Sequence, residues 1–182
     1  LIIIFVLIFV LRIVSKSDLR KKAKCIRKSL SIAEKSTIAI EKIRGNTLYI
    51  PAKNVLIYYP LRYELNLLAL LDDEKNFYLP RVCGENLQIC PFKKGDKLVT
   101  SSFNICEPCS NFINPRNLDL VVVPALMADK SGFRLGYGGG FYDRFLVENN
   151  TVKTILPIAK ELIVEELPHE EFDIKIDEII PV

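Results

Sequence analysis

The sequence predicts a single α/β domain with a mostly parallel open sheet and helices on both faces, a Rossmann-like three-layer arrangement. Short, continuously apolar runs alternate along the chain with amphipathic stretches, which is the pattern of buried parallel strands joined by helices. The length of 182 residues suits one domain with a substantial core, and the apolar content of 49% is typical of a globular protein. No internal repeat or low-complexity linker indicates a second domain.

Two helices are expected at the start of this domain. Apolar residues recur at three- and four-residue spacing among basic residues over 16–30, which predicts an amphipathic helix. Ser31, followed three residues later by Glu34, forms a capping-box pattern that predicts the start of a second helix. Gly45 is expected to end it.

Strands and helices alternate over the rest of the chain. Strands are expected at the apolar runs Val55–Tyr59, Asn76–Leu79, Leu87–Cys90, Leu120–Val123, Lys153–Ile158 and Ile174–Ile180. Helices are expected at Leu65–Leu71, Phe141–Glu148 and Glu161–Glu166. A turn is expected at 94–96, and a loop over 100–117, where Ser, Asn, Pro and Cys are frequent.

Charge is unevenly distributed along the chain. The formal net charge of +3 is too small to indicate nucleic-acid binding by itself. Residues 16–28 carry seven Lys or Arg against one Asp, whereas residues 160–182 carry eight Asp or Glu against two Lys. We expect these segments either to meet in the fold or to line a site for a charged ligand with a metal.

Cysteine usage indicates a reducing compartment. The five cysteines stand at uneven positions and do not form a disulfide framework, so we expect a cytoplasmic protein. Cys106 and Cys109 have the spacing of a metal or redox pair. They lack a second pair and a nearby His for zinc, and Pro108 lies in a loop-like stretch, so a functional role is not favoured.

The first 11 residues are wholly apolar. A membrane-spanning helix needs about 20 such residues, and a secretory signal has a basic segment that is missing here. We interpret residues 1–14 as an extension outside a domain that spans residues 15–182. A membrane anchor formed by this extension is the alternative.

The block of residues 134–144 gives the strongest functional signal. It reads Arg-Leu-Gly-Tyr-Gly-Gly-Gly-Phe-Tyr-Asp-Arg and holds four of the eight glycines of the chain. Glycines between a strand and a helix let backbone N–H groups converge on an anion, and the helix N-terminus adds roughly half a positive charge. Arg134 and Asp143 flank the glycines and suit a phosphate and a metal ion. A purely structural turn is the alternative, which four glycines in five positions make less favoured.

Several motifs in a fixed order resemble the 5-formyltetrahydrofolate cyclo-ligase family, also called methenyltetrahydrofolate synthetases. The similarity spans residues 16–182, and the glycine block is its most specific part. The motifs are Lys16-x-x-Leu19-Arg20, Tyr59-Pro-Leu-x-x-Glu64, Leu79-Pro80-Arg81, Asp119-Leu-Val-Val-Val-Pro124, Asp129, Gly132, the glycine block, Leu167-Pro168 and Asp173-x-x-x-Asp177.

The resemblance implies a chemistry as well as a fold. Such enzymes use ATP and Mg²⁺ to phosphorylate the formyl oxygen of 5-formyltetrahydrofolate, after which nitrogen 10 attacks and phosphate leaves with ADP also released. Phosphoryl transfer depends on positioning and charge neutralisation, so no Ser-His-Asp arrangement is required. ATP and 5-formyltetrahydrofolate are the implied partners. We expect a monomer with no nucleic-acid partner, and no membrane partner unless the N-terminal extension forms one.

The resemblance also assigns roles to residues at matching positions. The implied catalytic residues are Arg134, Lys16 and Arg20. The implied ATP-binding residues are Lys16, Ser17, Asp18, Leu19, Arg20, Arg134, Leu135, Gly136, Tyr137, Gly138, Gly139, Gly140, Phe141 and Tyr142. Tyr59 and Glu64 are the implied substrate contacts, and Asp143 and Asp177 the implied Mg²⁺ ligands. Without the resemblance, the basic helix would be interpreted as a solvated face and Tyr59 as the end of a buried strand.

Other function classes explain the sequence less well. A dinucleotide-dependent oxidoreductase would show G-x-G-x-x-G at the first strand–helix turn, whereas this loop lies late in the chain. A basic protein that binds nucleic acid or a membrane surface would leave the glycine block unexplained. A catalytically inactive relative stays open because the chain has Ala125, Ala128 and Phe172 where the family usually has Gly, an aromatic residue and His. Gly139 also stands where some relatives place Lys.

Overall fold

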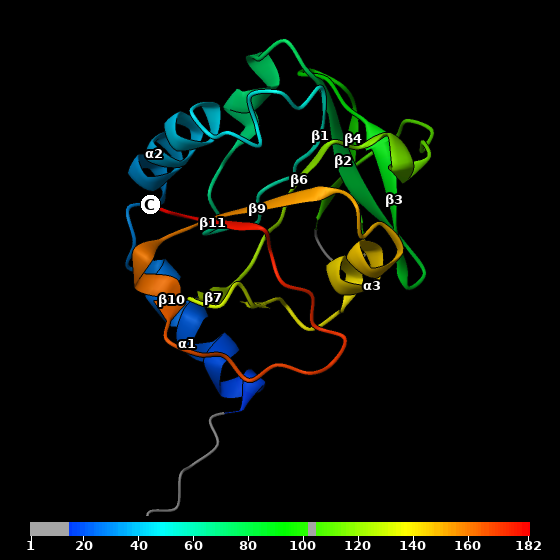
Figure 1. Ribbon diagram of the computed structural model, residues 1–182. Helices are drawn as coiled ribbons and strands as arrows, with labels where there is room; N and C mark the ends of the chain where they lie inside the picture. The colour runs from blue at the N-terminus through cyan, green and yellow to red at the C-terminus, as the bar shows by residue number, and fades with distance from the viewer. Residues whose placement is uncertain (1–14, 102–104) are drawn as a thin grey trace, which may run out of the picture.

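The structure is a computed structural model that describes residues 15–101 and 105–182, and the apolar extension lies outside these residues. A six-stranded sheet forms its centre, with the strand order β11-β9-β6-β1-β2-β3 (Figure 1). These strands are β1 (Asn54–Leu56), β2 (Asn76–Cys83), β3 (Asn86–Pro91), β6 (Leu120–Val122), β9 (Lys153–Ile158) and β11 (Glu178–Pro181). Every neighbouring pair is parallel except β2 and β3, so the predicted mostly parallel sheet is confirmed.

Helices cover both faces of the sheet, as predicted. They are α1 (Lys16–Lys28), α2 (Ile32–Arg44) and α3 (Phe141–Glu148). Ala23 of α1 and Phe145 of α3 pack with Leu56 of β1 in one core cluster. Ala39 of α2 packs with Val55 of β1 in the other. Because neighbouring strand residues point to opposite faces, β1 contributes to both cores and lies in the middle layer.

Two smaller sheets extend this framework. In one of them, β7 (Met127–Asp129) lies between β10 (Ile163–Val164) and β8 (Arg134–Leu135). In the other, β4 (Leu98–Thr100) pairs with β5 (Cys106–Pro108). The predicted loop over 100–117 is therefore wrong at its start, and it also contains the short helix η2 (Pro115–Asn117).

Three further elements differ from the prediction. The helix expected at 65–71 is a five-residue 3-10 helix, η1 (Leu68–Asp72), because a turn this short does not repay the cost of nucleating an α-helix. The helix expected at 161–166 is the short η3 (Lys160–Leu162) followed by β10, because the β-branched pair of β10 aligns with β7. The last strand begins at Glu178, because Ile176 and Asp177 bond instead to Gly132 and Thr154.

The ends of α1 and α2 are capped only partly as the sequence predicts. Ser15 caps α1, accepting a hydrogen bond of 3.1 Å from the backbone N–H of Asp18. Ser31 occupies the N-cap of α2 without a side-chain hydrogen bond, so the predicted capping box is wrong. Gly45 ends α2 as expected.

The basic and acidic segments meet in the fold. Lys16 Nζ lies 2.6 Å from Asp173 Oδ2 and 3.2 Å from Glu170 Oε1. Lys35 of α2 pairs with Glu161 at 3.0 Å. The five cysteines carry no disulfide bonds. Within residues 15–101 and 105–182, the helices are too short or too polar to cross a membrane.

Candidate functional site

The glycine block forms the connection between β8 and α3. Arg134 and Leu135 belong to β8, and Gly140 is the N-cap of α3 with a φ of 66°. Gly138 has a φ of 109°, a conformation that residues with a Cβ rarely adopt. Since Gly140 offers no side-chain cap, α3 starts at a bare backbone turn that is suited to an anion.

The same loop is too crowded for side chains at two of its glycines. A Cβ on Gly139 would lie 2.6 Å from the ring of Phe141. A Cβ on Gly140 would lie 2.6 Å from Nη1 of Arg144. Arg144 itself holds the loop by donating to the carbonyl of Gly139 at 2.9 Å. A lysine at position 139 would therefore require the ring of Phe141 to move.

Arg20 of α1 lies against the glycine block. Its Nε donates to the carbonyl of Gly136 at 2.9 Å, and its guanidinium carbon lies 3.5 Å from the position that a Cβ on Gly138 would occupy. Among the described residues, Arg20 has no carboxylate partner. The structure thus brings together the two segments to which the sequence assigned ATP binding.

The other members of the N-terminal segment lie elsewhere. Lys16 is bound to Asp173 and Glu170. Burial lowers the pKa of Lys16, but hydrogen bonds to these two carboxylates outweigh it, so the pKa lies above its usual value. Ser17 and Asp18 are exposed, and Leu19 packs against the core. Of residues 16–20, Arg20 is the one with a side-chain hydrogen bond to the glycine block within the described part of the chain.

Arg134 forms a buried ion pair with Asp143. The side chain of Arg134 is 3% exposed, and its Nη2 lies 2.9 Å from Asp143 Oδ1. Its Nη1 donates to the carbonyl of Ile174 at 2.9 Å, and the N–H of Ile174 donates to the same Asp143 oxygen. In this state Arg134 ties β8 to α3 and to the segment before β11, and its role in catalysis stays a prediction.

The two predicted metal ligands lie in different surroundings. Asp177 accepts hydrogen bonds from the N–H and hydroxyl of Thr154, at 2.9 and 2.7 Å, and thereby joins β9 to the start of β11. Burial raises the pKa of Asp177, but the hydrogen bonds from Thr154 and the charge of Lys153 have the larger combined effect. The pKa of Asp177 therefore lies below its usual value. Asp143 and Asp177 share no contact in the part of the chain that the structure describes. No cluster of three or more His, Cys, Asp or Glu suited to a metal occurs there either.

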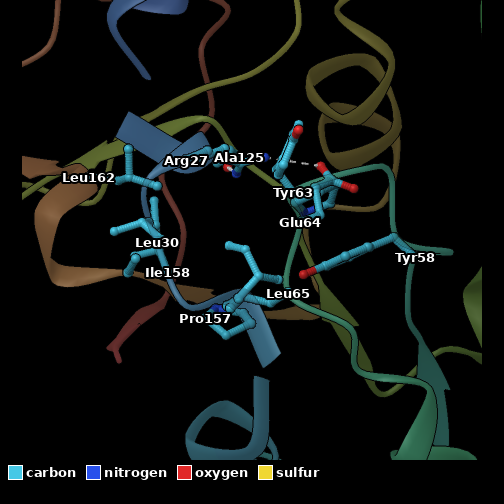
Figure 2. A pocket seen from close by; sticks show the side chains of 13 residues that line it. Arg27, Leu30, Tyr58, Tyr63, Glu64, Leu65, Ala125, Pro157, Ile158 and Leu162 are labelled. Atoms are coloured by element: carbon cyan, nitrogen blue, oxygen red, sulfur yellow. Dashed lines mark hydrogen bonds and ion pairs between the residues drawn. The ribbon is translucent and has the colours of Figure 1, made fainter. Parts of the chain in front are cut away.

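Glu64, Tyr137 and Arg27 form a buried polar cluster, of which the sequence predicted the first two as site residues but not Arg27. The hydroxyl of Tyr137 donates to Glu64 Oε1 at 2.6 Å and accepts a hydrogen bond from Arg27 Nη1 at 2.8 Å. Arg27 also lies 3.6 Å from Glu64 and donates to the carbonyl of Ala125 (Figure 2). Glu64 and Arg27 are only 5% and 8% exposed. Arg27 stands seven residues after Arg20, on the same helix face, and this spacing was the signal that could have identified it.

Three phenols surround the carboxylate of Glu64. Burial, followed by the charge of Glu64, raises the pKa of Tyr58, Tyr137 and Tyr142 above the usual value. The hydroxyl of Tyr142 is buried and has no hydrogen-bond partner among the described residues. All three phenols therefore remain protonated at neutral pH, and the hydroxyl of Tyr137 already donates to Glu64.

Tyr59 is separated from this cluster. It packs with the core on the α2 side of the sheet. Tyr59 and Glu64 have no contact with each other in the described part of the chain. The strand expected at 55–59 is shorter in the structure, because β1 ends at Leu56. Tyr59 is half-buried and lies three residues beyond that end, so it does not end the strand. Its contact with a substrate stays a prediction.

An open groove of about 350 Å³ lies beside the cluster. Its lining includes Lys24, Arg27, Lys28, Arg62, Tyr63 and Tyr137. Lys24, Lys28 and Arg62 have no carboxylate partners among residues 15–101 and 105–182. A groove with unpaired cations and aromatic rings suits a flat ligand that carries carboxylates.

The fold and the site together define a class: an α/β protein whose glycine-rich loop opens a helix and receives a cation from the N-terminal helix. Backbone N–H groups and a cation placed in this way are suited to an anion such as phosphate. Residues 12–182 match the model of the 5-formyltetrahydrofolate cyclo-ligase family, and the chain belongs to this family.

Individual relatives agree with this assignment. The chain is 34% identical over 142 residues to the 5-formyltetrahydrofolate cyclo-ligase of Haemophilus influenzae, covering 71% of this chain and 75% of the relative. It is 30% identical over 188 residues to that of Mycolicibacterium smegmatis, covering 91% and 93%. The structure of Aquifex aeolicus 5,10-methenyltetrahydrofolate synthetase is similar, with a TM-score of 0.80, 29% identity and coverage of 91% and 89%.

Proposed function

We propose that the protein is an ATP-dependent ligase that cyclises 5-formyltetrahydrofolate to 5,10-methenyltetrahydrofolate and releases ADP and phosphate. The observation that carries this proposal is the contact of Arg20 with the glycine block, in a chain that belongs to the cyclo-ligase family. Its relatives are named for the same reaction. The five free cysteines support a cytoplasmic location, and we expect a monomer.

In the proposed mechanism the backbone of residues 136–140 and the guanidinium of Arg20 hold the ATP phosphates. The formyl oxygen attacks the γ-phosphorus and breaks its bond to the β–γ bridging oxygen, giving an iminophosphate and ADP. Nitrogen 10 of the folate then attacks the formyl carbon and gives its proton to the leaving phosphate, and the carbon–oxygen bond breaks to release that phosphate. The protein contributes position and positive charge and needs no nucleophile of its own.

Asp143 fits the expected Mg²⁺ better than Asp177. Oδ1 of Asp143 is bonded to Arg134 and Ile174, but Oδ2 has no hydrogen bond among the described residues. Mg²⁺ is commonly held by one or two carboxylates together with phosphate oxygens. When bound, the ion would neutralise phosphate charge beside the first turn of α3. Both oxygens of Asp177 are bonded to β9, so its role would require these bonds to open.

The groove supports a folate as the second substrate. A folate carries an aromatic body and at least two carboxylates on its glutamate. Tyr63 and Tyr137 offer aromatic rings, each with an arginine over one face, and Lys28 and Arg62 have no carboxylate partner within residues 15–101 and 105–182. We expect Arg62→Gln to raise the KM for 5-formyltetrahydrofolate several-fold with little change in kcat, since surface charges act mainly on binding. The matched control is Lys22→Gln, on α1 but outside the groove.

The test is a spectrophotometric assay of methenyltetrahydrofolate formation from 5-formyltetrahydrofolate. ATP and Mg²⁺ are supplied together, and a parallel reaction replaces ATP with an analogue that has a non-hydrolysable β–γ bridge. We expect product in the first reaction and none in the second. Binding of ATP without any product would instead identify a catalytically inactive relative. Absence of both binding and product would refute the proposed function.

A further inference from the structure

Two arginines on one face of α1 hold adjacent residues of the glycine block. Arg20 donates to the carbonyl of Gly136, and Arg27 donates to the hydroxyl of Tyr137. Residues seven apart in a helix lie almost one above the other. The helix α1 therefore holds the glycine block by two hydrogen bonds. The first is made to a backbone carbonyl and the second to a side-chain hydroxyl.

The hydroxyl of Tyr137 also reaches a second loop. Its partner Glu64 lies in the segment after β1, and Oε2 of Glu64 accepts from the N–H of Leu61 at 2.8 Å. One oxygen atom thus joins the glycine block to residues 61–64, the segment that borders the groove. Figure 2 shows Arg27 joined to Glu64 by a dashed line, and both residues line the pocket together with Tyr58.

This junction resists small displacements because its charges are buried. Moving Tyr137 away would remove the closest partner of Glu64 and a partner of Arg27. Leaving buried polar groups unpaired is costly, so such networks favour discrete arrangements over gradual ones. Between Leu61 and Glu64, Tyr63 has a φ of 69°, a strained conformation that persists only while its surroundings impose it.

We propose that the Tyr137 hydroxyl, positioned by Arg27, couples the nucleotide loop to the folate-binding loop, so that occupation of one site raises affinity at the other. The inference rests on the proposed function for the identity of the two ligands. Tyr137 and Arg27 act here as positioning residues, because their effect on one ligand is transmitted through Glu64 to the other. Coupling of this kind is reciprocal.

The first experiment measures this coupling by isothermal titration calorimetry. The Kd of the non-hydrolysable ATP analogue is determined with and without saturating 5-formyltetrahydrofolate, in the full-length protein. We expect folate to lower this Kd by about tenfold in the unmodified protein. In Tyr137→Phe, which keeps the ring and removes the junction oxygen, we expect a change of less than about twofold.

Two further variants separate coupling from general damage. Tyr78→Phe removes a phenolic hydroxyl from β2, outside the groove, and should keep the full effect. Arg27→Lys keeps a positive charge but cannot bond to both Tyr137 and Ala125, and should weaken it. Circular dichroism melting checks that every variant is folded. Unchanged coupling in Tyr137→Phe, equal loss in Tyr78→Phe, or no coupling in the unmodified protein would each overturn the proposal.

A second measurement needs no folate. In hydrogen–deuterium exchange, the ATP analogue alone should slow amide exchange in residues 61–66 of the unmodified protein but not of Tyr137→Phe. Normal turnover with no such transmitted protection would refute the coupling and leave the proposed function intact. Transmitted protection without turnover would support the coupling and refute the proposed reaction.

Discussion

The ion pair between Arg134 and Asp143 allows a prediction in which removing both partners is less harmful than removing one. The side chain of Arg134 is 3% exposed, whereas that of Asp143 is 24% exposed. Asp143→Ala would leave a buried cation whose remaining hydrogen bond, among the described residues, is to the carbonyl of Ile174. Breaking a buried pair in this way costs about 3 kcal/mol, which for a domain of this size lowers Tm by about 6–12 °C.

Arg134→Met replaces the arginine by an apolar side chain of similar length and leaves the more exposed carboxylate behind. We expect it to cost about 1–2 kcal/mol, less than Asp143→Ala. The double variant has no unpaired charge and should be more stable than Asp143→Ala by about 1 kcal/mol or more.

Urea denaturation followed by circular dichroism measures all three free energies of unfolding. Equal m-values would show that the variants unfold by the same transition. A double variant that is less stable than the unmodified protein by the summed cost of the two single changes, and therefore less stable than Asp143→Ala, would refute this account of the pair. All three variants are expected to lose turnover, since each disturbs the start of α3.

Three further predictions concern single positions. Arg20→Ala should lower kcat/KM at least about 100-fold with little change in Tm. Lys21→Ala, at an exposed position of the same helix, should leave kcat/KM and Tm unchanged. Steady-state kinetics and thermal melting measure the two quantities. Gly140→Ala and Gly84→Ala both place a Cβ at positive φ, and each should lower the free energy of unfolding by about 1 kcal/mol. Only Gly140→Ala should lose turnover, because its Cβ also collides with the side chain of Arg144 in the glycine block. Burial raises the pKa of Asp173, but the ion pair with Lys16 outweighs burial, so the pKa lies below the usual 3.8. The ion pair therefore stabilises the fold above about pH 4, and this stabilisation is lost as the pH falls below that value. Asp173→Asn should therefore flatten the fall in Tm between pH 5 and 3, and an unchanged slope would contradict this assignment.

The sheet could be predicted from the sequence because its strands are buried on both faces. The run at β6 is continuously apolar, and β9 is buried from Thr154 to Ile158, which is the pattern of strands in the middle of a parallel sheet. The stretch at 161–166 was misread as a helix because local pattern does not reveal that Ile163 and Val164 lie beside β7. The β4–β5 hairpin was missed because a short edge strand carries little hydrophobic pattern.

The residues of the site likewise fall into those that could be predicted from the sequence and those that could not. The glycine block and Arg20 were found because their residue types are informative in sequence, and their contact could be expected once both were assigned to phosphate binding. Arg27 was hidden in a basic run that looks like a solvated face. Its partners Glu64 and Tyr137 lie 37 and 110 residues away along the chain, so only the folded structure reveals the cluster. The structure also distinguishes three cations that the sequence treated alike, because Arg134 and Lys16 are paired with carboxylates.

The meeting of the basic and acidic segments has a consequence for how the chain folds during synthesis. Lys16 of α1 binds Asp173, and α2 packs against the strand that begins at Glu178. Both N-terminal helices therefore leave the ribosome long before their partners have been made. Such distant contacts slow folding and leave apolar surface exposed in the interval. We expect nascent chains arrested before residue 170 to bind a general chaperone more strongly than the complete chain does.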